Sequence, residues 1–313
     1  MTSVTPIIPI TRDGQVKKVL MAPGGPELSR IIQGYWRMAE WDMNSQQRLS
    51  FIKQHVEMGI TTVDHAAVYG KPSCESLFGE VLKWNPGLRD KLEIISKCDI
   101  YLKDPAASDR LVAHYNSGKG RIIASVEQSL TRLNTDHLDV LLLHRPDLLM
   151  DADEVAEAFA ELRKSGKVKH FGVSNFTPSQ FLLLQSRLDS PLVTNQVEIN
   201  PLHTDATEDG TLDQSQQLHV RPMAWSCLAG GKILADQDNE LGRTLNELAE
   251  ELGASSIDQV IYAWVMRLPS NPLPILGSGN IERTRSAVAS LELSLNHEQW
   301  YRVWVAAKGH GVP

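Results

Sequence analysis

The stretch Leu138-Asp139-Val140-Leu141-Leu142-Leu143-His144 decides the fold class of this 313-residue chain. Its apolar side chains fall on both faces of an extended segment, which is typical of a strand buried in a parallel sheet. Amphipathic helical patterns lie on either side of it, at 120–133 and at 152–165, and Gly166 ends the second of them. A buried strand between two helices predicts a βαβ arrangement.

The same alternation of strand and helix runs through most of the chain. Strand patterns occur at 30–35, 61–66, 92–98, 138–144, 169–174, 193–200, 221–227 and 273–278. Helical patterns occur at 44–58, 73–84, 120–133 and 152–165, after Thr177-Pro178, and at 212–218, 244–252, 257–268, 281–291 and 297–307. Eight uninterrupted units predict an α/β fold of the closed (β/α)8 TIM-barrel type, because open doubly wound sheets usually have fewer strands and often a second domain.

The segments around these units complete the predicted organisation. No linker or shift in composition divides the units, so we expect a single domain over 1–313 with its core at about 30–310. A short run at 16–21, followed by Pro23-Gly24-Gly25-Pro26, predicts a short N-terminal β-hairpin, and the last helical patterns predict extra C-terminal helices. The long stretch 99–119 has no strand pattern and predicts a functional loop.

Composition and charge exclude several classes of protein. The formal net charge is −7 and the Lys and Arg residues are scattered, so no basic surface for nucleic acid or an anionic membrane is expected. Three separated cysteines without Cys-x-x-Cys spacing argue against disulfides and zinc, and the histidines form no metal-ligand spacing. The N-terminal segment lacks a signal-peptide pattern, and no later apolar run reaches membrane-spanning length. We expect a cytoplasmic monomer or weak homo-oligomer without a metal and without nucleic-acid or membrane partners.

Four polar residues follow the carboxyl ends of neighbouring predicted strands, where barrel enzymes gather their chemistry. They are Asp64, Tyr69, Lys97 and His144. Asp64 interrupts an apolar strand, and Lys97 on the next strand would lie within ion-pair reach of it. A nearby ammonium lowers the pKa of a phenol, so Lys97 would make Tyr69 a better acid at neutral pH. The alternative is a buried ion pair that only closes the barrel mouth.

These four residues, on the second, second, third and fourth strand units, resemble the pattern of the aldo-keto reductases. The resemblance covers nearly the whole chain and includes Val63-Asp64 with Tyr69-Gly70, Ser96-Lys97, LLHRPD at 142–147, GVSNF at 172–176 and NQVEINP at 195–201. Within the family the chain is similar to bacterial oxidoreductases related to potassium-channel β-subunits, in particular the YdhF type. The resemblance implies that Tyr69 is the general acid, that Lys97 and Asp64 tune its pKa, and that His144 orients the substrate carbonyl.

The resemblance also implies a nicotinamide cofactor. The implied cofactor-binding residues are Ser174, Asn175, Gln196, Trp225, Ser226, Leu228, Gly230, Gly231, Lys232, Gly277, Ser278, Gly279, Asn280 and Arg283. The first three would hold the carboxamide and Trp225 would stack on the ring. The chain departs from the family pattern at the phosphate end, where Gly277 replaces a basic residue and Ser286-Ala287 replaces a Glu-Asn pair. Arg283 still favours NADP, as NADPH, over NAD, because a guanidinium fork suits phosphate.

Several of these assignments have plainer alternatives. Ser174 and Asn175 would equally fit caps of the following helix, Trp225 an ordinary core position, and Gly230-Gly231-Lys232 a plain turn. The residues expected to line an aromatic substrate pocket are Tyr35, Trp36 and Tyr101, although surface packing of the long loop also explains Tyr101. His65 points to the opposite face of its strand from Asp64 and is expected to be structural.

The implied function is NADPH-dependent reduction of an aldehyde or ketone to an alcohol. A small carbonyl substrate would receive a hydride from the nicotinamide and a proton from Tyr69. One alternative is an NADP-binding sensor or accessory subunit with little turnover. Another is a Schiff-base aldolase that uses Lys97, which Asp64 disfavours by keeping the lysine charged.

Overall fold

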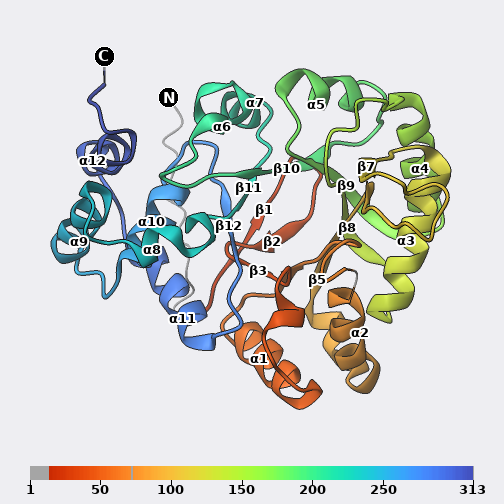
Figure 1. Cartoon of the computed structure of the whole chain (residues 1–313), viewed down its shortest axis with the longest axis horizontal. Coiled ribbons are helices and arrows are strands. Elements are labelled where there is room, and N and C mark those ends of the chain that lie inside the picture. The colour runs from red at the N-terminus through yellow and green to blue at the C-terminus, as the bar shows by residue number, and fades with distance from the viewer. Residues whose placement is uncertain (1–13, 72, 313) are drawn as a thin grey trace.

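A closed barrel of eight parallel strands forms the centre of the computed structural model, which describes residues 14–71 and 73–312 (Figure 1). The strands follow one another around the barrel in chain order, and the last pairs with the first. They are β3 (Ile32–Gly34), β4 (Thr62–Asp64), β5 (Glu93–Cys98), β8 (Leu138–Leu143), β9 (Val168–Ser174), β10 (Leu192–Glu198), β11 (Met223–Trp225) and β12 (Leu273–Leu276). Each overlaps one of the eight predicted strands, so the predicted (β/α)8 TIM-barrel fold is confirmed.

Helices surround the barrel on its outside (Figure 1). The helices are α1 (Ser45–Glu57), α2 (Cys74–Trp84), α3 (Lys119–Leu133), α4 (Ala152–Lys164), α5 (Pro178–Gln185), α6 (Asp205–Glu208), α7 (Thr211–Gln217), α8 (Lys232–Ala235), α9 (Glu240–Leu252), α10 (Ile257–Met266), α11 (Ile281–Ala289) and α12 (His297–Lys308). The part of the chain that the structure describes also contains the short 3-10 helices η1 (Met38–Glu40), η2 (Pro86–Lys91), η3 (Ala229–Gly231) and η4 (Ser290–Glu292). Within 14–71 and 73–312, no helix combines the length and apolar character needed to cross a bilayer.

Local sequence explains where several helices begin and end. Asn44, Thr177 and Asn296 each accept a hydrogen bond from the backbone of a glutamine three residues later, whose side chain bonds back to the cap. This reciprocal capping box satisfies two backbone donors that the first turn leaves free. Gly253 and Gly309 end α9 and α12 in the left-handed conformation, which glycine adopts without steric cost.

The N-terminal β-hairpin covers the amino-terminal ends of the barrel strands. Strands β1 (Lys18–Leu20) and β2 (Glu27–Ser29) pair in antiparallel register. The Ser29 amide donates to Thr62 Oγ1 at 2.8 Å, at the start of β4, and the Arg221 amide donates to the Met21 carbonyl at 2.8 Å, shortly before β11. The predicted hairpin is therefore confirmed. The expectation about the N-terminal segment itself concerns residues 1–13, which lie outside the described residues.

The extra C-terminal helices are also present as predicted. Helix α12 packs beside α9 and α10, and Trp264 of α10 stacks on Trp300 of α12 with ring centroids 4.8 Å apart. Each indole N–H donates to the backbone carbonyl of the other tryptophan, at 3.0 and 3.1 Å. Buried indole N–H groups need such partners, so this reciprocal pair fixes the last helix on the barrel.

The long segment after β5 contains a structure that the sequence did not predict. Strands β6 (Ile100–Tyr101) and β7 (His114–Tyr115) form a two-stranded antiparallel hairpin between β5 and α3. The Asn116 amide donates to the Asp99 carbonyl at 2.9 Å, which closes the base of the hairpin. The segment is therefore an ordered excursion rather than an irregular loop.

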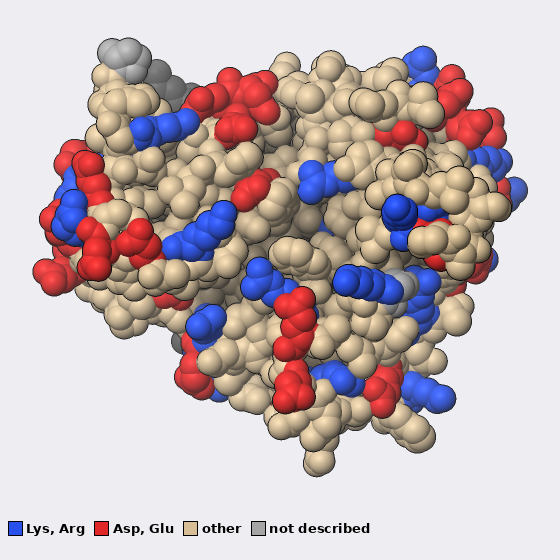
Figure 2. All heavy atoms as spheres, viewed as in Figure 1, with Lys and Arg blue, Asp and Glu red and all other residues tan. Residues whose placement is uncertain are grey.

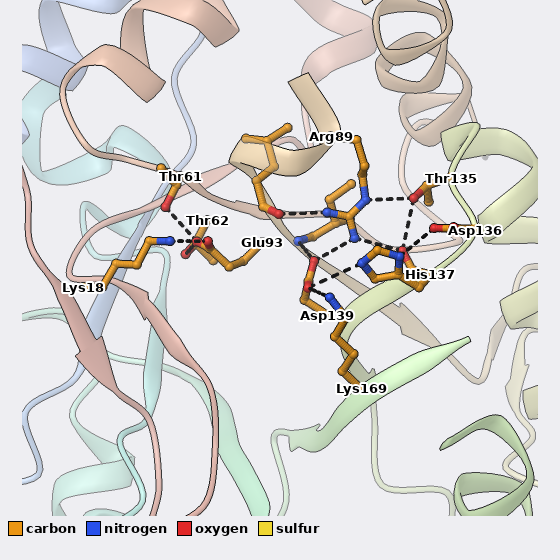
Figure 3. A network of polar contacts seen from close by, with 12 residues as sticks. Lys18, Thr61, Thr62, Arg89, Glu93, Thr135, Asp136, His137, Asp139 and Lys169 are labelled. Carbon is orange, nitrogen blue, oxygen red and sulfur yellow. Dashed lines mark hydrogen bonds and ion pairs between the residues drawn. The ribbon is translucent and has the colours of Figure 1, made fainter. Parts of the chain in front are cut away.

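Asp139 of β8 holds three neighbouring strands together at the amino-terminal end of the barrel (Figure 3). Its carboxylate accepts hydrogen bonds from the Ile94 amide of β5 at 2.9 Å, from Arg89 at 2.8 Å and from Lys169 of β9 at 3.0 Å. Burial alone would raise the pKa of this carboxyl, but Arg89, the Ile94 amide and Lys169 outweigh it and lower the pKa. Beside this network, Glu93 accepts from Lys18 of the hairpin at 2.5 Å (Figure 3).

Helices α2 and α3 pack closely against each other at Gly79. A Cβ atom at this position would lie 1.9 Å from the Arg132 carbonyl oxygen and 2.7 Å from the Leu133 carbonyl carbon. Both contacts are with backbone, which does not move aside as a flexible side chain does. The close packing of the two helices therefore depends on the absence of a side chain at Gly79.

Candidate active site

Asp64, Lys97 and Tyr69 meet at the carboxyl end of the barrel. Asp64 is the last residue of β4, Lys97 lies near the end of β5, and Tyr69 lies in the turn between β4 and α2. The Lys97 ammonium donates to Asp64 Oδ2 at 2.7 Å, to the His65 carbonyl at 2.8 Å and to the Tyr69 hydroxyl at 3.0 Å. The expected contact between Asp64 and Lys97 is present, and both side chains are buried.

The protonation states of this cluster follow from burial and from the ion pair. Burial alone would lower the pKa of Lys97, but Asp64 and Tyr69 outweigh it and raise the pKa. Desolvation raises the pKa of Tyr69, and the Lys97 ammonium opposes this rise only in part. The lowered Tyr69 pKa expected from the ammonium alone is therefore wrong, because desolvation outweighs the charge of Lys97. At neutral pH the cluster therefore holds a charged lysine and a protonated phenol.

His144 lies beside this cluster, directly after β8. Its ring meets the Tyr69 ring edge-on, with centroids 5.7 Å apart, and its backbone amide donates to the Cys98 carbonyl at 3.2 Å. Burial, then the charges of Lys97 and Arg145, lower the pKa of His144 well below its ordinary value. The imidazole is therefore neutral at physiological pH and offers one N–H donor.

A hydrogen bond across the barrel was not expected from the sequence. The Gln196 side-chain amide of β10 donates to Asp64 Oδ1 at 2.9 Å. Strands β10 and β4 are separated by β11, β12 and β3 in one direction and by β9, β8 and β5 in the other, so they lie on opposite sides of the barrel. Asp64 thus has one oxygen on Lys97 and the other on Gln196, and its carboxylate is held from two sides.

Ser174, Asn175 and Trp225 form a second cluster at the same mouth. The Ser174 hydroxyl donates to the Gln196 carbonyl at 2.8 Å, and the Asn175 amide donates to the Ser174 hydroxyl at 2.8 Å. The Trp225 indole N–H donates to Asn175 Oδ1 at 3.2 Å. The alternative that Ser174 and Asn175 cap the next helix is wrong, because the side chain of Thr177 provides that cap.

Arg145 is a residue of this mouth that the sequence reading did not assign to the site. Its guanidinium lies 5.8 Å from the centre of the half-buried Trp225 ring. The available signal was its position, since it directly follows His144 at a strand end. A cation on one face of Trp225 leaves a mixed polar and aromatic surface beside Tyr69 and His144.

The predicted phosphate-end residues lie in two turns. After β11, Ser226 has φ 53°, and Gly230 and Gly231 have φ 67° and 95°, so the chain turns sharply before Lys232 begins α8. Leu228 belongs to the same turn, and its carbonyl accepts from the Gly231 amide at 2.9 Å.

The second turn joins β12 to α11. Asn280 is the N-cap of α11 and accepts from the Glu282 amide, and its own amide donates to Ser278 Oγ at 3.1 Å. A Cβ at Gly277 would meet nothing within 4 Å, whereas a Cβ at Gly279 would lie 2.5 Å from Trp41. Arg283 is exposed in the first turn of α11.

The three residues expected to line an aromatic pocket lie in different surroundings in the structure. Trp36 is 57% exposed, and its ring lies 6.5 Å from the Tyr69 ring. The expectation for Tyr35 is wrong, because its side chain is fully buried and its hydroxyl is 2.7 Å from His55 Nε2. Tyr101 stacks on His114 of the β6–β7 hairpin with centroids 5.4 Å apart.

His65 packs in the core, as expected for a structural residue. Its ring stacks on Tyr35 at 4.9 Å and meets Phe78 edge-on at 4.5 Å. Burial lowers the pKa of His65 to about 3. Across 14–71 and 73–312, no three His, Cys, Asp or Glu residues gather in an arrangement that would hold a metal ion.

Comparisons with known proteins match nearly the whole chain to one family. A model of the aldo/keto reductase family matches residues 30–306. The oxidoreductase YdhF of Escherichia coli is 56% identical over 299 residues, which cover 95% of this chain and 100% of that protein. A 6-dehydroglucose reductase of Agrobacterium fabrum is 41% identical, over 91% of this chain and 96% of that protein.

A solved structure extends the comparison to three dimensions. An aldo/keto reductase from Klebsiella pneumoniae, in complex with NADP and acetate, has a TM-score of 0.74 with this chain. The two sequences are 28% identical, and the match covers 92% of this chain and 94% of that chain.

Proposed function

Because the chain belongs to the aldo/keto reductase family and is therefore an oxidoreductase of that family, we propose that it reduces the carbonyl group of a small aldehyde or ketone with NADPH. The observation that carries this proposal is the hydrogen-bonded series from Tyr69 through Lys97 to Asp64 at the barrel mouth. A protonated phenol, a fixed ammonium and a neutral imidazole supply an acid, a charge and a donor side by side.

Tyr69 is the proposed general acid. Its hydroxyl is protonated at neutral pH, so it has a proton to give to a carbonyl oxygen that gains negative charge. The phenolate left behind would lie 3.0 Å from the Lys97 ammonium, which favours it electrostatically. Asp64 holds that ammonium in place and keeps it charged.

His144 is the proposed orienting donor. A neutral imidazole has one N–H to donate, and beside Tyr69 this N–H would fix the carbonyl oxygen next to the phenol. Because the ring does not carry a charge, His144 does not compete with Tyr69 as the proton source. The two rings would thus divide orientation and proton transfer between them.

The residues of the opposite half of the mouth fit a nicotinamide cofactor. Ser174, Asn175 and Gln196 are linked by hydrogen bonds and would hold the carboxamide, and Trp225 would lie against the ring. The open space at Gly277 and the first turn of α11 fit phosphate, since helix N-termini present free N–H groups. When bound, the nicotinamide supplies the hydride.

The Schiff-base alternative is disfavoured by the charge of Lys97. An amine must be neutral to attack a carbonyl group, and the pKa of Lys97 is raised rather than lowered. Its ammonium is also committed to Asp64, the His65 carbonyl and Tyr69.

Replacement of Tyr69 by phenylalanine tests the proposal. Loss of a general acid lowers the rate by about 10²- to 10⁴-fold, so Tyr69→Phe should bind NADPH as the wild type does and lose turnover by that factor. Tyr301→Phe, on the outer helix α12, is the matched control and should keep the wild-type rate. An unchanged rate in Tyr69→Phe would contradict the proposed role of Tyr69. NADPH binding without turnover of any carbonyl in the wild type would instead favour a sensor or accessory subunit.

The substrate panel should include polyhydroxylated aldehydes, because one relative is named for reducing 6-dehydroglucose. For the cofactor, we expect tighter binding of NADPH than of NADH. Arg283→Ala should weaken NADPH binding by about ten-fold or more, since a charge-assisted hydrogen bond contributes about 1.5–3 kcal/mol. NADH binding should not change. Equal losses for both cofactors would contradict recognition of the 2′-phosphate by Arg283.

A further inference from the structure

A cavity lies beside the barrel mouth, between the β6–β7 hairpin and α3. Its volume is about 460 Å³, within the range of small-molecule pockets. The turn before Tyr69 forms one wall through Ala67 and Val68, and Tyr101 contributes from the hairpin. None of Asp64, Lys97, His144 and the proposed cofactor-binding residues lines it.

The walls of this cavity carry an excess of positive charge. Figure 2 shows Lys and Arg side chains gathered over the side of the molecule where β7 and α3 lie in Figure 1. The cationic residues that line the cavity are Lys71, Lys103, Arg110, Arg121 and Arg132. Two lining residues are acidic, Asp99 and Asp104. This excess stands out in a chain whose formal net charge is −7.

The two lysines of the cavity are available to a ligand. Each of the three arginines has a carboxylate partner, which is Asp104 for Arg110 at 2.9 Å, Asp109 for Arg121 at 2.7 Å and Glu75 for Arg132 at 3.5 Å. Lys71 and Lys103 form no ion pair with any residue of the described part of the chain, and both are exposed. Two free ammonium groups beside three held guanidinium groups suit a ligand with two negative charges.

Asp99 adds a buried carboxyl group to the wall of the cavity. One of its oxygens accepts from the Arg145 amide at 3.3 Å, and the other has no hydrogen-bond partner among the described residues. Burial raises the pKa of Asp99 well above its ordinary value, which favours the protonated form of the carboxyl group. A neutral carboxyl group retains an O–H donor that a phosphate oxygen can accept.

We propose that the cavity between the β6–β7 hairpin and α3 binds a small phosphomonoester, with Lys71 and Lys103 on its phosphate group. A phosphomonoester carries about two negative charges at neutral pH and three acceptor oxygens. Its small organic part fits a cavity of this volume against Val68 and Tyr101. The site is separate from the proposed cofactor site at the first turn of α11.

Titration of phosphate into the Arg283→Ala variant, which lacks the proposed contact to the cofactor's phosphate, tests the proposal. The probes are inorganic phosphate and glycerol phosphate, with glycerol as the uncharged control, measured by calorimetry on Arg283→Ala. We expect one saturable phosphate per chain. In the Arg283→Ala variant, the further changes Lys71→Gln/Lys103→Gln should weaken phosphate binding by about ten-fold or more.

The matched control changes the net charge by the same amount elsewhere. Lys53 on α1 and Lys83 on α2 are exposed, and Lys53→Gln/Lys83→Gln should leave phosphate affinity within about two-fold of the parent. Equal affinities of the two double variants would overturn the proposal. The absence of saturable binding in the Arg283→Ala background would also overturn it. Circular dichroism of each variant establishes that a loss of binding is not a loss of fold.

Discussion

Replacing Asp139 with alanine should destabilise the barrel by about 3–5 kcal/mol, the cost of breaking a buried ion pair from one side. The side chains of Asp139 and Arg89 are each only 12% exposed, and the carboxylate also accepts from the buried Ile94 amide. Alanine would leave that amide without its partner and the guanidinium of Arg89 without its counter-ion. Each such loss alone costs about 1–3 kcal/mol or more.

Lys169 provides the matched comparison within the same network. It contacts the same carboxylate at 3.0 Å, but its side chain is 51% exposed. Exposed ion pairs contribute about 0–1 kcal/mol, so Lys169→Ala should cost less than about 1 kcal/mol. Urea unfolding followed by far-UV circular dichroism measures both variants against the wild type. Because the network lies at the amino-terminal end of the barrel, the rate of turnover of folded Asp139→Ala should not change.

The pH dependence gives the prediction a second signature. The folded pKa of Asp139 is lowered from 3.8, so its ionised form stabilises the fold fully above the unfolded pKa. That contribution is lost as the pH falls through the folded pKa. The stability difference between wild type and Asp139→Asn should therefore be constant from about pH 5 to 8 and shrink below about pH 4. Equal costs for Asp139→Ala and Lys169→Ala, or a difference that grows in acid, would refute the reasoning.

Three further predictions concern packing, thiols and the active-site imidazole. Gly79→Ala should destabilise the protein by about 1–3 kcal/mol or more, because the added Cβ would meet the Arg132 carbonyl. A Cβ at Gly87 would meet nothing within 4 Å, so Gly87→Ala is the control and should lower the stability far less. Thermal unfolding measures both variants. The three cysteines, Cys74, Cys98 and Cys227, are buried and have raised pKa values. A thiol reagent at pH 7 should therefore label the native protein slowly and the urea-unfolded protein at once. Rapid labelling of the native protein would contradict this prediction. The pH profile of kcat/KM should show no ionisation near pH 6.5 from His144, because the pKa of His144 is well below that value. A change of slope near pH 6.5 that disappears in His144→Asn would refute the neutral imidazole.

The fold was predictable because its signals are long and repeated. Eight strand patterns separated by helical patterns sufficed for the barrel, and capping residues such as Thr177 marked a helix start. The β6–β7 hairpin was missed because each of its strands has only two residues, too short for any periodicity. Helices α6 and α8, of four residues each, were missed for the same reason.

The site was predictable only where the chemistry was local to strand ends. Asp64 was noticed as a carboxylate in an apolar strand, and Asp139 presents the same anomaly in the stretch that decides the fold, yet its network went unnoticed. Tyr35 was misassigned because an aromatic residue at a strand end fits a pocket and a core equally well. The bond from Gln196 to Asp64 joins opposite sides of the barrel, and no sequence spacing carries that information. The roles proposed for the site residues stay predictions.

The residues proposed for proton transfer and those proposed for cofactor binding come from different halves of the chain. Asp64, Tyr69, Lys97 and His144 all come from the first four barrel strands and the turns after them, while the proposed nicotinamide cradle comes from the last four. The hydrogen bond from Gln196 to Asp64 bridges these halves at the mouth. Two fragments cut between α4 and β9 would thus each carry one incomplete set of groups. Recovery of carbonyl reduction on mixing them would report that the halves had joined in the native register.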